Sequence, residues 1–452
     1  MLTLFRRPQL HTQILMGLAV GAAAGVFSNV MWRDAPQLLW VVDNIANPIG
    51  QVFLRMLFMV VVPLVFTSLA LGVATLGDIS RIGRIGGKAL GFFLATTALA
   101  ASLGLLLMNF IRPCGSLDPA VRNALLTQYT SQAAEKVTMA TENGFGINTF
   151  INIVPRNPLS AAVNGDMLAL IFFTLIFGIA LTKLPRETAA PVIRVLQGVS
   201  EAVMVIIGFA MAIAPLGVAG LIFGVTARFG LDVLQSLGMY VIVVLAGLSI
   251  HLFGVIPLLA KTLAGIDPAT FFRRSRALMV TAFSTSSSNA TLPTTIRTAE
   301  EGFGVPKEVA GFVLPLGATM NMNGTALFEG MTVLFLAQVF GVALSISTQI
   351  IVVAMSVITA VGVAGVPGGS IPLLVMVLEM VGVPGAGIAL ILGVDRILDM
   401  ARTVPNVCGD LLTSLVVTRS EGLPFVIPSP IELEPAPEPE PEFAAASESA
   451  TY

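Results

Sequence analysis

Five charged or amide side chains recur at helical spacing near the end of the chain. Asp395, Asp399, Arg402, Asn406 and Asp410 follow one another at steps of four, three, four and four residues. At about 100° of rotation per residue in an α-helix, these side chains fall within a stripe roughly 80° wide. Charged groups in an apolar segment are costly unless they face protein, water, an ion or a substrate. The stripe therefore predicts a binding site on one face of a helix.

A structural network of ion pairs is the alternative explanation of this stripe. Asp399 and Arg402 could neutralise each other inside a helix bundle without binding any ligand. Asn406 and Asp410, however, extend the stripe beyond any neutral pair. We therefore favour a functional site.

The composition is that of an integral membrane protein. Of the 452 residues, 55% are hydrophobic and 11% are charged, whereas about a quarter are charged in soluble domains. The formal net charge of −2 provides no basic surface, so we expect no nucleic-acid partner. The two cysteines and two histidines stand apart and match no metal or disulfide framework. We expect neither an enzyme nor a bound cofactor.

Six apolar runs have the length of bilayer-spanning helices. They lie at residues 14–32, 53–76, 88–111, 166–183, 198–224 and 234–260. Arg6 and Arg7 precede the first run, and basic clusters follow the second, fourth and sixth. The positive-inside rule places all these clusters in the cytoplasm, together with the N-terminus.

Two later segments are interrupted before they could cross a hydrocarbon core about 30 Å thick. Residues 277–296 contain a short apolar arm, a run of serines and Pro293, and residues 330–378 are split by glycine and proline at 365–370. Freed backbone groups at membrane depth are tolerated only where they line a cavity. We interpret both segments as re-entrant hairpins that enter from opposite faces, although each alone could be a kinked spanning helix. A helix with a polar interruption follows each one, a pattern typical of inverted repeats around a midplane site.

Four motifs occur along the chain in the order STSSSNATLP, NMNGT, AGVPGGS and DRILDMARTVPNVCGD. Together they resemble the dicarboxylate/amino acid:cation symporter family, which includes bacterial glutamate/aspartate carriers and animal excitatory amino acid transporters. The likeness covers most of the chain, to about residue 418. It implies an all-α membrane protein with eight transmembrane helices, two re-entrant helical hairpins, inverted repeats, a trimeric scaffold and a mobile transport domain.

The resemblance also implies how the chain divides. Residues 1–87 would hold scaffold helices 1 and 2, and residues 88–111 helix 3 of the transport domain. Residues 112–230 would hold an extracellular loop and scaffold helices 4 and 5. Residues 231–418 would hold helix 6, hairpin 1, helix 7, hairpin 2 and helix 8 of the transport domain. Residues 419–452, rich in Pro and Glu, are expected to form a disordered acidic cytoplasmic tail, because they have too few apolar residues to fold.

Two residues of the stripe carry the substrate prediction. Asp399 matches the family position that holds a substrate amino group, and Arg402 the position that holds the side-chain carboxylate of an acidic substrate. The chemistry agrees, because an ammonium needs a fixed anion and a guanidinium fork binds a carboxylate through two hydrogen bonds. A plain C4-dicarboxylate would leave Asp399 facing negative charge. The resemblance implies further substrate contacts at Ser287, Ser288, Thr325, Val366, Ser370, Thr403 and Asn406.

Many relatives carry an extra arginine where this chain has Ser286 or Met400. Arg396 could replace that arginine only if its helix face allowed it.

The coupling ion remains open between sodium, which we favour, and protons. Asp410 matches a sodium-coordinating aspartate of the family, and oxygen ligands from broken helices suit an alkali cation. Asn323 stands where the family motif carries an aspartate, so one predicted ion position lacks its anion. The resemblance implies ion ligands in three positions: Gly317, Asn321, Asn406 and Asp410; Thr319 and Met322; and Thr96, Thr97, Asn321 and Asn323.

We expect a secondary active symporter that imports glutamate or aspartate by alternating access. It would be a multi-pass protein of the inner (plasma) membrane, a homotrimer in the lipid bilayer, with both termini cytoplasmic. The alternatives are a C4-dicarboxylate or neutral amino acid symporter of the same family, or a channel-like anion pathway. An intramembrane enzyme that used Ser287 or Ser288 would need a base, and none occurs at a recognisable spacing.

Overall fold

The structure is a computed structural model that describes residues 10–32, 35–76, 83–113, 154–164, 167–362 and 368–423. Within these ranges the chain forms helices joined by short turns, and no β-strand occurs among them. Most of the predicted extracellular loop and residues 424–452 of the predicted tail lie outside the described residues.

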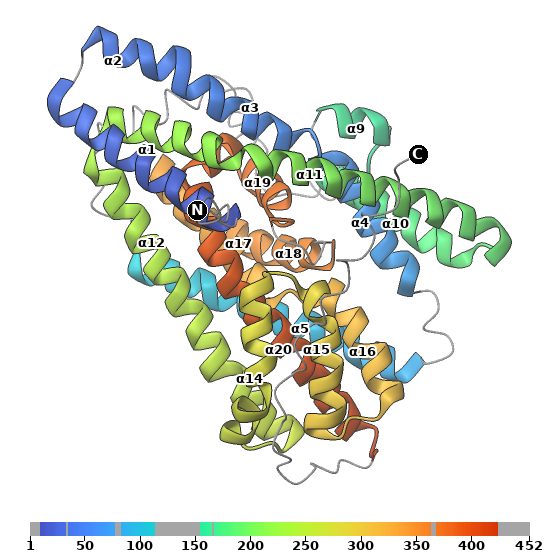
Figure 1. Cartoon of the computed structure of the whole chain (residues 1–452). Coiled ribbons are helices and arrows are strands. Elements are labelled where there is room, and N and C mark those ends of the chain that lie inside the picture. The colour runs from blue at the N-terminus through green and yellow to red at the C-terminus, as the bar shows by residue number, and fades with distance from the viewer. Residues whose placement is uncertain are drawn as a thin grey trace, which may run out of the picture.

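The first half of the described chain contains the longest described helix, α11 (Figure 1). Its elements are α1 (Leu10–Trp32), α2 (Pro36–Val41), η1 (Val42–Ala46), α3 (Asn47–Phe58), α4 (Val61–Leu76), α5 (Gly83–Ile111), α9 (Pro158–Asn164), α10 (Met167–Lys183) and α11 (Arg186–Phe229).

The second half contains several short helical segments between the longer helices α12 and α20. Its elements are α12 (Leu231–Ile250), η3 (His251–Val255), α13 (Ile256–Leu259), η4 (Ala260–Ala264), α14 (Pro268–Thr285), α15 (Ser288–Arg297), η5 (Thr298–Gly302), α16 (Lys307–Met320), α17 (Asn323–Phe340), α18 (Ile346–Gly362), α19 (Ile371–Met380), η6 (Gly385–Leu390) and α20 (Leu392–Ser420).

Five of the helical runs in the described ranges are long and apolar enough to cross a membrane. They are Thr12–Trp32, Pro36–Ala74, Arg84–Ile111, Arg186–Phe229 and Leu234–Ala264. They overlap five of the six predicted spans. The remaining span, 166–183, corresponds to the 17-residue helix α10. The predicted number of membrane spans therefore stays a prediction.

The predicted bounds of one span, 198–224, are too narrow. Helix α11 has 44 residues and starts at Arg186, directly after Pro185. Hydrophobicity marks only the residues that suit the bilayer core, whereas the charged first turns of α11 continue the same helix. Pro191 and Pro215 lie inside it without ending it.

Helices α1, α3 and α4 pack on α11 at one side of the molecule, and α10 packs on α4 (Figure 1). Helix α1 packs closely along α11 because it presents glycine there. A Cβ atom on Gly17 would lie 2.3 Å from the backbone oxygen of Pro215, and one on Gly21 would lie 2.5 Å from that of Ala219. Small residues at such positions are how membrane helices approach each other without polar side chains.

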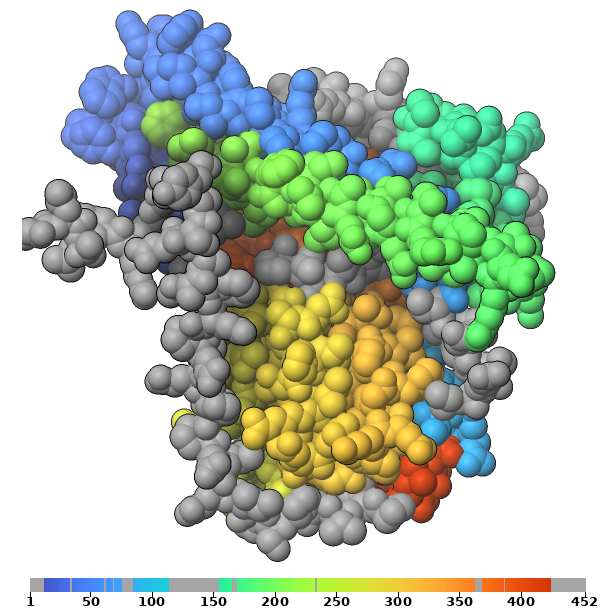
Figure 2. All heavy atoms as spheres, turned by 45° about the vertical axis from the view of Figure 1, so that its right-hand side comes forward, coloured from blue at the N-terminus to red at the C-terminus, as the bar shows by residue number. Residues whose placement is uncertain are grey.

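The remaining helices form a second group around α20 and α17. Helices α14, α15, α16 and α17 pack on α20, and α5 packs on α17 and α18. In the space-filling view, α11 crosses above this group (Figure 2). Helix α20 also contacts α1 and α11, so the predicted site helix lies at the seam between the two groups.

The segments predicted as interrupted are helix pairs or broken helices. Helix α14 ends before Ser286, whose φ of 51° is left-handed, and Ser287 caps α15 by accepting a hydrogen bond of 3.1 Å from the backbone nitrogen of Ala290. Helices α16 and α17 are separated by Asn321 and Met322, which confirms the polar interruption predicted in the helix after the first re-entrant segment. The connection from α18 to α19 passes through residues 363–367, outside the described residues.

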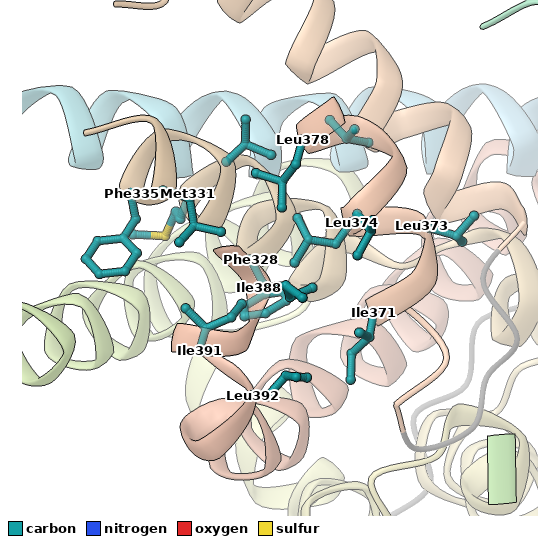
Figure 3. Packing of buried hydrophobic residues seen from close by; sticks show 14 of the residues in the cluster. Phe328, Met331, Phe335, Ile371, Leu373, Leu374, Leu378, Ile388, Ile391 and Leu392 are labelled. Carbon is teal, nitrogen blue, oxygen red and sulfur yellow. The ribbon is translucent and has the colours of Figure 1, made fainter. Parts of the chain in front are cut away.

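A buried apolar core holds these short helices in place. Phe328 and Met331 of α17 belong to one buried cluster with Leu374 of α19, Ile388 of η6 and Leu392 of α20 (Figure 3). Side chains from four separate elements therefore fix where α20 begins relative to the break before α17.

Candidate functional site

The structure brings three members of the predicted stripe into one ion-pair network. Arg402, only 2% exposed, donates from Nε and Nη2 to Oδ1 of Asp399, at 3.1 and 2.8 Å. Its Nη1 donates to Oδ1 of Asp395 at 3.0 Å. The spacing of four and three residues places all three side chains on the same helix face. One buried guanidinium thus joins two buried carboxylates.

An aromatic ring completes the surroundings of this guanidinium. The Cζ atom of Arg402 lies 4.2 Å from the centre of the Phe328 ring, which belongs to α17. Guanidinium groups stack favourably on aromatic faces, and the interaction is stronger where water is excluded. Phe328 therefore holds the planar guanidinium in one orientation.

Asp399 faces the α18–α19 connection with its other oxygen. Its Oδ2 accepts a hydrogen bond of 3.1 Å from the backbone nitrogen of Gly368 and lies 3.5 Å from Nη1 of Arg396. Thr403 donates its hydroxyl to the backbone oxygen of Asp399 at 2.7 Å. The carboxylate predicted to hold a substrate amino group is therefore fully engaged by this chain.

Asn406 connects α20 to the first turn of α17. Its Oδ1 accepts from the backbone nitrogens of Gly324, at 2.7 Å, and Thr325, at 3.3 Å. Its Nδ2 donates to the Thr325 hydroxyl at 3.1 Å and approaches the Met322 sulfur at 3.5 Å. Asn406 thus caps a helix that begins more than eighty residues earlier.

Asp410 lies against the end of α16. Its Oδ1 accepts a hydrogen bond of 2.9 Å from Nδ2 of Asn321, and its side chain is 2% exposed. A Cβ atom on Gly317 would lie 2.6 Å from the same oxygen, so the helix can approach only because residue 317 is glycine. The structure therefore joins three of the four residues predicted for the first ion position.

A second buried oxygen cluster joins α5 to the start of α17. Thr97 donates to Oδ1 of Asn323 at 2.8 Å, and Thr96 approaches the same oxygen at 3.4 Å. Thr96 also donates to the backbone oxygen of Phe92 at 2.8 Å. These are the residues predicted for the third ion position, apart from Asn321.

Other predicted residues lie apart from these contacts. Thr319 is exposed and donates its hydroxyl to the backbone oxygen of Leu316 at 3.0 Å, whereas Met322 is buried. Ser287 and Ser288 are buried at the start of α15, and Ser370 is buried at the start of α19. Val366 lies outside the described residues. Roles for these side chains stay predictions.

One charged residue near the site was missed. Glu329 of α17 is fully buried, and its Oε2 accepts a hydrogen bond of 2.7 Å from the hydroxyl of Thr359 in α18. Among the residues that the structure describes, Oε1 has no hydrogen-bond partner. A lone glutamate in an otherwise apolar helix was the available signal, because such residues face the interior of membrane proteins.

Comparisons with known proteins agree on one family. A family model described as the sodium:dicarboxylate symporter family matches residues 10–420. The chain is 36% identical over 417 residues to the proton/sodium-glutamate symport protein of Bacillus caldotenax, covering 92% of this chain and 96% of that protein. It is 34% identical over 410 residues to the proton/glutamate-aspartate symporter of Escherichia coli (strain K12), covering 90% and 92%. It is 32% identical over 414 residues to the C4-dicarboxylate transport protein of Bacillus subtilis (strain 168), covering 91% and 93%.

Proposed function

The chain belongs to the sodium:dicarboxylate symporter family, and from this premise we propose that it imports glutamate or aspartate. As a member of this family it is a cation-coupled membrane transporter and not an enzyme. The acidic amino acid and the coupling ion are our proposal.

The observation that carries the substrate proposal is the pairing of Asp399 with Arg402. An acidic amino acid has one ammonium and two carboxylates, so its site needs a fixed anion and a fixed cation close together. Asp399 and Arg402 lie within one helical turn, and both are buried. On binding, the substrate ammonium would pair with Asp399, and the side-chain carboxylate of the substrate would accept two hydrogen bonds from the guanidinium of Arg402.

Two buried oxygen clusters and one buried carboxyl group support cation coupling. Asp410 with Asn321, and Asn323 with Thr96 and Thr97, offer the hard oxygen ligands that an alkali cation requires. Glu329 offers a candidate proton site, because its carboxyl group is buried and its Oε1 has no hydrogen-bond partner among the described residues. Sodium remains our favoured ion, with protons as the alternative.

The grouping of helices supports alternating access within the family framework. Helices α1, α3, α4, α10 and α11 would form the scaffold, and the group around α17 and α20 would carry the site across the membrane. A homotrimer, eight membrane spans, re-entrant hairpins and cytoplasmic termini are parts of the same proposal.

Competition in proteoliposomes tests the substrate. Uptake of labelled glutamate should be suppressed by unlabelled aspartate and much less by succinate or serine. Succinate lacks the ammonium that Asp399 would bind, and serine lacks the carboxylate that Arg402 would bind. Suppression by succinate that equals suppression by aspartate would contradict the proposal.

A C4-dicarboxylate is the second candidate, because one similar relative is a C4-dicarboxylate transport protein. Asp399 argues against it, since a substrate without an ammonium would leave this carboxylate next to further negative charge. Asp399→Ser separates the two. It should abolish glutamate uptake, whereas a carrier built for dicarboxylates should keep or improve its succinate uptake.

A further inference from the structure

Arg396 places a second guanidinium beside the carboxylate of Asp399. The two residues lie one helical turn apart in α20, and Nη1 of Arg396 is 3.5 Å from Oδ2 of Asp399. The Arg396 side chain is 16% exposed, so it is largely withdrawn from water. Arg402 engages the other oxygen, Oδ1. Asp399 therefore lies between two cations of its own helix.

Within the described part of the chain, the anions that line the cavity beside Arg396 are Asp395 and Asp399 of its own helix. A narrow cavity between α20 and the α11 group, with room for about one water molecule, is lined by apolar side chains of α1, α3 and α11. Among the described residues that line it, the charged ones are Asp395, Arg396 and Asp399. Arginine carries a positive charge in proteins, so in this position Arg396 depends on the carboxylates of α20.

The charges of this cluster balance without a ligand. Asp395 and Asp399 contribute two negative charges, and Arg396 and Arg402 contribute two positive charges. Without Arg396, the same cluster would carry a net negative charge against the apolar seam. Removing one partner of a buried ion pair is strongly unfavourable, because the remaining charge stays desolvated and has no opposite charge to compensate it.

We propose that Arg396 is the internal counter-ion of the empty carrier. It pairs with Asp399 when no substrate ammonium is bound, and the ammonium displaces it on binding. The displaced guanidinium then pairs with Asp395, which Arg402 releases when it binds the substrate carboxylate. The empty site thereby crosses the apolar seam along α11 as a neutral cluster, and no other cation has to accompany its return. This inference rests on the proposed function, in which Asp399 binds the substrate ammonium and α20 moves along α11.

The proposal separates two transport modes that use the same site. Exchange of external labelled for internal unlabelled substrate needs only the loaded carrier to cross. Net uptake also needs the empty carrier to return. A counter-ion of the empty state must therefore affect net uptake far more than exchange.

The experiment measures both modes in proteoliposomes that contain the wild type or one of three variants. For Arg396→Gln, which keeps the side-chain length but loses the charge, we expect exchange within about threefold of the wild type and net uptake reduced about tenfold or more. Arg396→Lys keeps the charge and should retain both modes. Arg297→Gln is the matched control, because it neutralises an exposed arginine that pairs with Glu301 away from the site.

Two results with Arg396→Gln would overturn the inference. If exchange and net uptake fell by the same factor, Arg396 would act in substrate binding or in the fold. If both modes were retained, Arg396 would have no role in the empty state. The wild type supplies a test that needs no variant. Its net uptake should be the same when potassium or N-methylglucamine fills the vesicles, and a strict need for potassium inside would also overturn the inference. Absence of glutamate exchange in the wild type would instead refute the proposed function.

Discussion

Replacement of Arg402 by alanine should convert an acidic-substrate site into one that favours neutral amino acids. The guanidinium is 2% exposed, donates three hydrogen bonds and lies against Phe328. A substrate carboxylate that enters without it would be buried beside Asp395 and Asp399. Leaving such a charge unpaired costs about 3–5 kcal/mol, which corresponds to roughly 100- to 4000-fold weaker binding at about 1.4 kcal/mol per tenfold change.

The assay is the ratio of glutamate to serine affinity, measured by calorimetry on the purified protein. The ratio cancels any general loss of stability that follows from unpairing two carboxylates. Arg402→Lys is the matched control, because lysine keeps the charge but offers a carboxylate no planar fork; its loss should be smaller, about 10- to 100-fold. If glutamate and serine weakened by the same factor in Arg402→Ala, Arg402 would not read the substrate side chain, and the reasoning would be refuted.

Three further predictions concern the coupling sites and the end of α20. Asn323→Asp adds an anion beside the Thr97 hydroxyl, so the sodium dependence of uptake should steepen; an unchanged Hill slope would contradict this. Gly317→Ala would place a Cβ atom 2.6 Å from Oδ1 of Asp410, and ion-driven uptake should fall about tenfold or more while the protein still elutes as one species. Glu421, beyond α20, has its pKa lowered by its hydrogen bond to Lys88. Its ion pair therefore stabilises the fold above the ordinary glutamate pKa of about 4.3, and this contribution is lost as the pH falls through the lower native pKa. Glu421→Gln should flatten the acid limb of the melting-temperature profile, whereas an unchanged limb would assign it to other carboxyl groups.

Helical periodicity was enough to predict which residues of α20 share a face. The steps between Asp395, Asp399 and Arg402 fix their relative directions once the segment is helical, and the structure joins all three. The break at Asn321 and Met322 could also be predicted from the sequence, because polar residues and glycine interrupt an apolar helix there.

Contacts between distant segments could not be predicted from local pattern. Asn406 looked like a ligand because of its place in the stripe, but its main observed contacts are with the backbone nitrogens of Gly324 and Thr325. The pairing of Glu329 with Thr359 joins two helices whose packing depends on the whole core. A hydropathy window also stopped short of the full α11, since it records suitability for lipid and not helix length.

The family membership has firmer support than the finer functional predictions. The sequence motifs lie within a match that spans residues 10–420. Glutamate and C4-dicarboxylate carriers are both among the similar relatives, so the family alone does not select a substrate. Asp399 and Arg402 make that selection in our proposal, by their charge and spacing.

The central claim is cation-driven accumulation of an acidic amino acid. It is tested most directly by uptake of labelled glutamate and aspartate into proteoliposomes, with a sodium gradient and a proton gradient imposed separately. The account predicts accumulation above equilibrium with an inward sodium gradient, and accumulation with the proton gradient alone would transfer the coupling to a carboxyl group such as Glu329. Uptake that follows neither gradient and never exceeds the external concentration would contradict the account.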